Sequence, residues 1–200
     1  MNHKLASYLC FTLWIALLLE AFVLAPPPKA GTYELIQGML LLQASIDPSI
    51  FALFQIIGIL PLLAAAYLFQ EGPLAWTALM LSFFLGAFAL LPYLCFRKWF
   101  GAKKPIGWIL GSQWLGLVPG TALCAFTLYG LNEGSPHLFW EAWRNDGFVQ
   151  IMSFDAIIFV LALQLLTYED AKARSGHGLL WGTLPLFGPI LWIAHRSKFQ

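Results

Sequence analysis

The stretch FVQIMSFDAIIFVLALQLL, residues Phe148–Leu166, decides the class of fold. It is long enough to cross a bilayer as a helix, since about 20 predominantly apolar residues span the hydrocarbon core. Its apolar residues do not alternate with polar ones, as they would in a strand of a membrane barrel. One acid, Asp155, lies near its middle. The stretch therefore predicts a membrane-spanning helix that carries an aspartate.

The rest of the chain has the same apolar character. Of its 200 residues, 60% are hydrophobic and 10% are charged, and the mean hydropathy is +0.73. Soluble domains contain about 25% charged residues. Backbone groups in lipid must bond to one another, which leaves helices or closed barrels, and the lengths of the apolar runs favour helices. We therefore predict an all-α, polytopic transmembrane helix bundle that forms one domain over residues 1–200.

Six apolar segments are candidate membrane spans, and two amphipathic segments are candidate interfacial helices. The predicted spans lie near 5–24, 49–69, 74–96, 106–131, 148–166 and 179–194, and the interfacial helices near 32–44 and 136–145. We interpret the first span as a retained anchor. The alternative is a cleaved signal peptide, which would leave five spans. No repeat of span order, polar positions or broken helices is evident that would predict a transporter with duplicated halves.

The distribution of Lys and Arg predicts an orientation. Loops after the first, third and fifth predicted spans carry seven of these residues, and the opposite side carries four. By the positive-inside rule the loop RKWFGAKK, residues 97–104, faces the cytoplasm, or the stroma in a thylakoid. The same count places both termini on the other side. We therefore predict an integral protein of a bacterial inner membrane or a thylakoid.

Asp155 is the strongest candidate for a functional residue. An aspartate near the centre of a membrane helix costs about 2.5–3.5 kcal/mol on insertion scales. No Lys or Arg lies within a predicted span, so we expect a neutral or hydrogen-bonded carboxyl group rather than an ion pair. Its candidate partners are Gln113, Ser112, Gln55 and Tyr93. Two interpretations stay open: a polar clasp between helices, and a proton or ligand site that faces a cavity.

Two further features concern the predicted spans. Glu20 is the second acid within them, and it lies near the end of its span, where we expect it to reach the headgroup region. Ser112, Gly116 and Gly120 recur at four-residue spacing, so they share one helical face. Small residues let helix backbones approach closely. We expect this face to pack against another helix of the same chain, with a dimer interface as the alternative.

Several other functions find no support in the sequence. The four histidines fall in loops or at termini, which disfavours a b-type haem, and we predict no metal site and no other cofactor. The net charge is +1 and no long run of Lys or Arg is present, so we predict no nucleic-acid partner. No nucleotide-binding or hydrolase motif occurs, and no catalytic residue can be assigned. These absences lower the expectation of an enzyme.

Two groups of segments resemble known membrane proteins. The first group is DPSIFALFQIIGILP (Asp47–Pro61) followed by LGAFALLPY (Leu85–Tyr93), and the second is VQIMSFD (Val149–Asp155) with Asp170, Arg174 and LFGP (Leu186–Pro189). Together they resemble uncharacterised multi-pass membrane proteins of cyanobacteria, chloroplasts and other bacteria. The resemblance covers roughly residues 47–195. It implies a helical membrane protein, with a photosynthetic membrane as one location, and it supplies no catalytic residues.

Three classes of function stay open. We favour a non-enzymatic accessory or assembly subunit that packs on a larger membrane protein complex within the lipid bilayer. One alternative is a small-solute or proton-coupled transporter in which Asp155 titrates. The other is a lipid- or isoprenoid-modifying membrane enzyme. Pigment or lipid binding is a further possibility.

Overall fold

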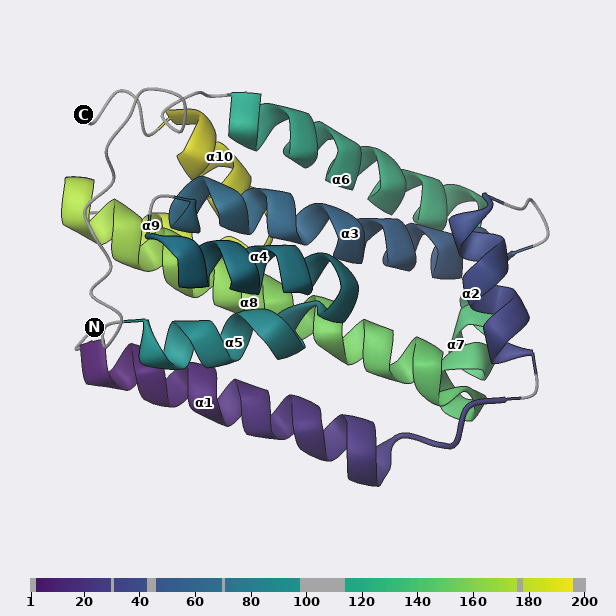
Figure 1. Cartoon of the computed structure of the whole chain (residues 1–200). Coiled ribbons are helices and arrows are strands. Elements are labelled where there is room, and N and C mark those ends of the chain that lie inside the picture. The colour runs from purple at the N-terminus through teal and green to yellow at the C-terminus, as the bar shows by residue number, and fades with distance from the viewer. Residues whose placement is uncertain are drawn as a thin grey trace.

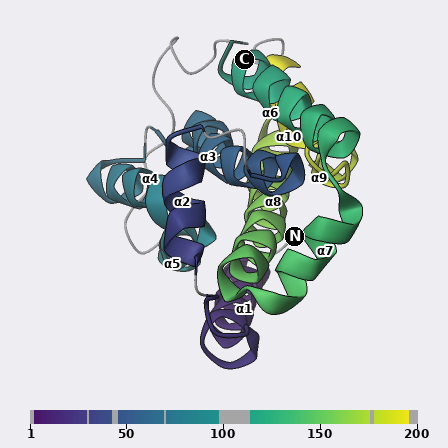
Figure 2. The same cartoon turned by 90° about the vertical axis from the view of Figure 1, so that its right-hand side faces the viewer.

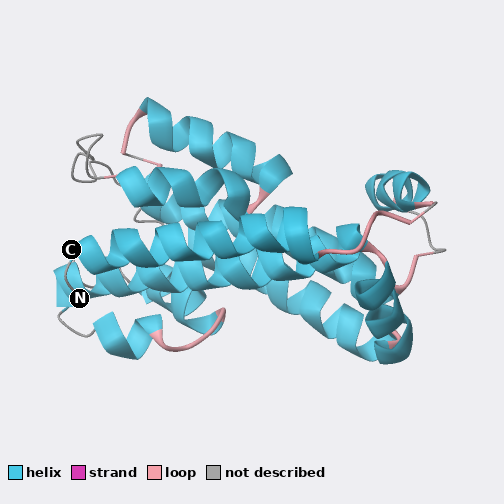
Figure 3. Cartoon of the chain, turned by 90° about the horizontal axis from the view of Figure 1, so that it is seen from below, coloured by secondary structure: helices cyan, strands magenta, loops and turns pink. Residues whose placement is uncertain are grey.

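The computed structural model describes residues 3–29, 31–42, 46–69, 71–97, 114–175 and 178–195, and every regular element in these ranges is a helix (Figures 1 and 3). In chain order the elements are α1 (His3–Leu19) with its π-helical continuation η1 (Glu20–Leu24), α2 (Thr32–Leu40), α3 (Pro48–Leu68), α4 (Pro73–Leu85), α5 (Ala87–Phe96), α6 (Trp114–Glu133), α7 (Pro136–Asn145), α8 (Gly147–Ser175), α9 (Gly178–Gly182) and α10 (Phe187–His195).

Three helices in the described ranges are long and apolar enough to cross a membrane: Leu5–Leu24, Pro48–Leu68 and Gly147–Arg174. They contain most or all of the predicted spans near 5–24, 49–69 and 148–166. The structure therefore supports an all-α bundle with membrane-spanning helices, but it does not confirm the number of six spans.

The predicted span near 74–96 is instead two helices, α4 and α5, that fold back on each other (Figure 1). Gly86 joins them with φ +55° and ψ −134°, a conformation that no helix contains. Glu71, before α4, accepts a hydrogen bond from Nε of Arg97, after α5, at 2.6 Å. Both ends of the segment therefore lie at the same end of the bundle. A single continuous helix was the wrong prediction, because length and hydropathy do not report a reversal at one glycine.

The predicted span near 179–194 is also divided. Its described residues form α9 and α10, and the turn between them contains Leu186 in the left-handed region at φ +60°. Gly188 approaches the Trp181 carbonyl so closely that a Cβ atom at this position would overlap it. The indole Nε1 of Trp192 donates to Oδ2 of Asp170 at 2.7 Å, which ties α10 to the end of α8. This segment is thus a second, shorter helical hairpin.

The remaining predicted segments differ in how much of them is described. The predicted span near 106–131 is described from Trp114 onward, as α6. α2 covers Thr32–Leu40 of the predicted interfacial helix near 32–44, and α7 has the same limits as the predicted one at 136–145. Ser135 precedes α7 as its N-cap, and its hydroxyl accepts a hydrogen bond from the amide of Leu138 at 3.3 Å.

The chain contains the same sequence of elements twice. A long helix leads to a short helix at the far end, a second long helix returns, and a helical hairpin follows. These elements are α1, α2, α3 and α4–α5 in the first half and α6, α7, α8 and α9–α10 in the second. In Figure 1, α2 and α7 both lie at the end of the bundle opposite the chain termini, and Figure 2 shows them on either side of that end.

Packing between helices repeats in the same way. α1 packs on α5 as α6 packs on α10, and α3 packs on α4 as α8 packs on α9. Across the halves, α3 contacts α6 and α8 contacts α1, while α3 and α8 contact each other. The hydroxyl groups of Tyr67 on α3 and Thr167 on α8 lie 2.8 Å apart at this central contact. The pairing indicates an approximate two-fold axis that passes between α3 and α8.

From the start of α3 and of α8 onward, equivalent residues differ in number by 99. Asp47 accepts from the amide of Ser49 at 2.9 Å, and Asp146 accepts from the amide of Phe148 at 2.9 Å, each at the start of the returning helix. Glu71 accepts from the Tyr93 hydroxyl at 2.6 Å, as Asp170 accepts from Trp192. The prediction that no such repeat is present was therefore wrong. The repeat is hard to see in the sequence because chemically similar rather than identical residues occupy the equivalent positions.

Candidate functional site

Asp155 lies on α8 beside the break between α4 and α5. Its side chain is 5% exposed, and its Oδ1 accepts a hydrogen bond from the amide of Ala87 at 2.8 Å. Gly86 lies so close that a Cβ atom there would overlap the carboxyl group. Position 86 therefore requires glycine for two reasons: its positive φ and its close approach to Asp155. The carboxyl group occupies the space that a side chain on residue 86 would need.

This arrangement follows from the chain reversal at Gly86. The first amides of a helix have no partners within it, and in lipid each unsatisfied amide costs several kcal/mol. α5 begins at Ala87, inside the bundle, so its first amide must find an acceptor elsewhere. Asp155 supplies that acceptor from α8, in the role that an N-cap side chain usually fills from the same helix. The carboxyl group is thus a clasp between two helices.

A cavity of about 530 Å³ adjoins the same carboxyl group. α2, α3, the α4–α5 hairpin and α8 contribute its walls, which are mainly apolar. Near α2 and α4 the lining includes Leu40, Phe84 and Leu85, whose side chains are exposed at the surface of the bundle, Phe84 to 88%. The lining therefore extends from exposed apolar residues at the surface of the bundle to the buried Asp155. Its volume is in the range of small-molecule sites.

Few polar groups line the cavity. Among its described lining residues, Asp155 is the ionisable one, and Gln55 on α3 carries a side-chain amide. No cation is paired with Asp155 in the described part of the chain. The cavity can therefore hold an apolar molecule and offer one carboxyl group and one amide to its polar part.

The expected partners of Asp155 have different positions in the structure. Gln55 lines the same cavity, whereas Tyr93 donates to Glu71 at the end of the hairpin. Gln113 and Ser112 lie outside the described residues. The amide of Ala87 was missed, because a backbone donor has no mark in the sequence. The one available signal was Gly86 within a long apolar run, since an isolated glycine there can mark a break.

Glu20 does not lie on the surface as expected. It is 5% exposed at the start of η1, which packs on α8, and its Oε1 has no hydrogen-bond partner among the described residues. A π-helical turn rotates the residues that follow it, and such turns recur at functional sites. Glu20 does not line the Asp155 cavity.

Gly116 and Gly120 of α6 face α10. A Cβ atom at Gly116 would lie 2.9 Å from Cβ of Ile193, and one at Gly120 would contact Ile190. These two glycines therefore allow α6 and α10 of one chain to approach closely.

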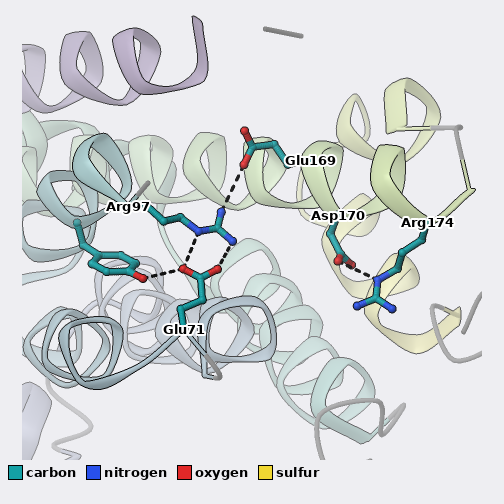
Figure 4. A network of polar contacts seen from close by, with 6 residues as sticks. Glu71, Arg97, Glu169, Asp170 and Arg174 are labelled. Atoms are coloured by element: carbon teal, nitrogen blue, oxygen red, sulfur yellow. Dashed lines mark hydrogen bonds and ion pairs between the residues drawn. The ribbon is translucent and has the colours of Figure 1, made fainter. Parts of the chain in front are cut away.

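Charged residues gather at the end of the bundle that holds both ends of the hairpin (Figure 4). Arg97 bonds through Nε and Nη2 to the carboxylate of Glu71, and its Nη1 lies 3.3 Å from Oε2 of Glu169 on α8. Burial lowers the pKa of Arg97, but the hydrogen bonds and charge of Glu71 and the charge of Glu169 outweigh it, so its pKa is raised. Arg174 donates to Asp170 at 2.9 Å, one helical turn along α8. This cluster holds α4, α5 and α8 together.

The described residues contain no group of three or more His, Cys, Asp or Glu side chains that could hold a metal ion. Comparisons with protein-family models, with curated proteins and with solved structures give no match for this chain.

Proposed function

We propose that this chain is an integral membrane protein that binds a lipid-soluble molecule in the Asp155 cavity. The observation that carries the proposal is the lining of the cavity, which is mainly apolar, includes exposed residues of the bundle surface and contains one buried carboxyl group. A site of this kind suits a ligand that arrives from the bilayer with its apolar part in the cavity and its polar part at Asp155.

The proposed topology has four crossing helices, α1, α3, α6 and α8, and two hairpins that enter and leave on one face. It places nine of the eleven Lys and Arg residues on that face and leaves Lys29 and Arg144 on the other. The nine are Lys4, Arg97, Lys98, Lys103, Lys104, Lys172, Arg174, Arg196 and Lys198. By the positive-inside rule this face is cytoplasmic, or stromal in a thylakoid. The asymmetry is larger than in a topology of six spans, and both termini join the RKWFGAKK loop on the positive face.

Solute transport is a second candidate, and the duplication favours it. Many transporters are built from repeated halves, with the substrate near the membrane midplane at a broken helix. Asp155 lies at such a break, close to the contact between the halves. Flux of the bound molecule in proteoliposomes would separate a transporter from a binding protein. An accessory role in a larger complex stays a prediction, for which stable co-purification of a partner is the test.

Gly58 provides a test of the cavity. It lies on α3 in the cavity wall, and a Cβ atom there would meet nothing within 4 Å. We expect Gly58→Trp to occupy enough of the cavity to exclude a ligand, while Gly58→Ala leaves it open. The measurement is mass spectrometry and absorbance of small molecules that co-purify in mild detergent. We expect a bound molecule with the wild type and Gly58→Ala and none with Gly58→Trp. Equal ligand content in all three proteins, or none in the wild type, would refute the proposal.

A further inference from the structure

We propose that the Asp155 cavity selects a hydrophobic organic cation, that is, an amine or a quaternary ammonium group on an apolar body. This inference rests on the proposed function and specifies the ligand. Its basis is that charge, backbone dipole and aromatic rings in the lining of the cavity all favour a positive group.

The first observation is the charge of the cavity lining. Asp155 is the ionisable residue among the described lining residues, and no Lys, Arg or His is among them. The amide of Ala87 bonds Oδ1 and the amide of Phe88 also bonds the carboxyl group, whereas a carboxylate can accept about four hydrogen bonds. Two neutral amides do not balance a full negative charge in an apolar setting. A cation from the ligand would balance it.

The second observation is the end of α4. The amide of Gly86 donates to the Ser82 carbonyl at 2.9 Å and closes the last turn. In a continuous helix, the carbonyls of residues 83–85 would accept hydrogen bonds from amides four residues later. Those amides belong to α5, so these three carbonyls have no partner within α4. The C-terminal end of a helix carries a partial negative charge. Residues 83–85 line the cavity, so this charge adds to that of Asp155.

The start of α5 carries the opposite partial charge, but its first two amides already bond Asp155. At the break between α4 and α5, the hydrogen-bond acceptors, which are the Asp155 carboxylate and the last carbonyls of α4, are therefore more numerous than the amide donors. In transporters, unwound carbonyls and helix C-terminal ends often bind cations.

The third observation is the aromatic lining. Five phenylalanines contribute to the cavity wall: Phe54, Phe83, Phe84, Phe88 and Phe148. The faces of aromatic rings attract cations, and aromatic cages are a common way to bind quaternary ammonium groups. A bare metal ion would leave most of a 530 Å³ apolar cavity unfilled, whereas an organic cation fills it. Size and chemistry together therefore favour the organic cation.

The experiment compares two probes of similar shape and opposite charge, tetraphenylphosphonium and tetraphenylborate. Binding to the full chain in detergent is measured by titration calorimetry, with detergent alone as the blank. We expect saturable binding of the cation and none of the anion. Asp155→Asn keeps an oxygen acceptor for Ala87 but removes the charge, so we expect about a tenfold or greater loss of affinity. Gly58→Trp should abolish binding, and Gly58→Ala should preserve it.

The outcomes separate this inference from the proposed function. If Asp155→Asn binds the cation as tightly as the wild type, or if both probes bind alike, the selection of cations is refuted. Loss of that binding in Gly58→Trp would then still support a ligand cavity. If neither probe binds, the inference is also refuted, and the molecules that co-purify decide the proposed function separately. A thermal unfolding scan of each variant shows that a loss of binding is not a loss of fold.

Discussion

The two helical hairpins have similar hydrogen bonds at their open ends but differ at their tips, the turns that join the two helices of each hairpin. In both, an aromatic side chain on the second helix donates to an acid at the end of the preceding long helix: Tyr93 to Glu71 in α4–α5, and Trp192 to Asp170 in α9–α10. At the first tip the amide of Ala87 bonds Asp155 on α8. At the second tip the amide of Phe187 bonds the Pro185 carbonyl at 2.6 Å, within the turn. The hydrogen bond that anchors the ends of the hairpin thus occurs in both halves. The hydrogen bond from the turn to a neighbouring long helix is described for α4–α5, whereas the turn of α9–α10 bonds within itself.

The position on α3 that is equivalent to Asp155 holds Ile56, which is 99 residues earlier. A hairpin of this kind therefore forms without an acid on the neighbouring long helix. The tip at Gly86 does need an acceptor for one amide, but a neutral acceptor would serve. The negative charge of a carboxylate is more than the hairpin requires. We therefore assign the charge of Asp155 to the ligand and its hydrogen bond to the fold.

The largest loss of stability is expected from a substitution of Gly86, where the turn between α4 and α5 approaches α8 most closely. Gly86→Ala adds a Cβ atom that overlaps Asp155 and places alanine at φ +55°. Backbone strain and loss of the bond to Ala87 together should lower the free energy of unfolding by about 3–5 kcal/mol. The measurement is unfolding by SDS in mixed micelles. Gly58→Ala is the control, and we expect it to be neutral or stabilising by up to about 1 kcal/mol, since its Cβ meets open space within a helix. Equal stability of the two variants would contradict the close approach at Gly86.

A carboxyl group at position 56, the equivalent of Asp155 in the first half, should find no amide to bond. Ile56→Asp places a carboxyl group near a tip whose first amides already bond within the turn. We expect a loss of about 3 kcal/mol in the same unfolding assay, close to the cost of an unpaired aspartate in a membrane helix. Ile56→Leu is the matched control and should cost about 1 kcal/mol or less. A stable Ile56→Asp variant would show that the two tips are less different than described.

The anchors at the two ends should differ in strength. Arg97→Ala leaves the buried carboxylate of Glu71 with Tyr93 as its one remaining partner among the described residues, so we expect a loss of about 2–3 kcal/mol in the free energy of unfolding. Trp192→Phe removes one hydrogen bond from Asp170, which keeps Arg174, and it should cost about 1 kcal/mol. Arg97→Lys should recover part of the loss, because lysine keeps the charge but not the paired geometry. The reverse order of the two losses would contradict the network in Figure 4.

The sequence predicts the long helices well and the hairpins poorly, for physical reasons. Runs such as Phe148–Leu166 are apolar throughout, and lipid permits few structures other than a helix there. The segment near 74–96 is equally apolar and has the length of a span, so only Gly86 hinted at its reversal. The partner of Asp155 was beyond prediction because it is a backbone amide freed by that reversal. The repeat was hidden because a hydrogen-bonding role is retained where the residue changes, as from Tyr93 to Trp192.

The most direct test of the central claim is the free energy of unfolding of Asp155→Asn relative to the wild type. Asparagine keeps an oxygen that can accept from Ala87, and it removes the charge that we assign to the ligand. Measured in detergent without added ligand, the variant should lie within about 1 kcal/mol of the wild type. A loss of about 3 kcal/mol or more would mean that the hairpin itself depends on the charge, and it would contradict the division of roles at Asp155.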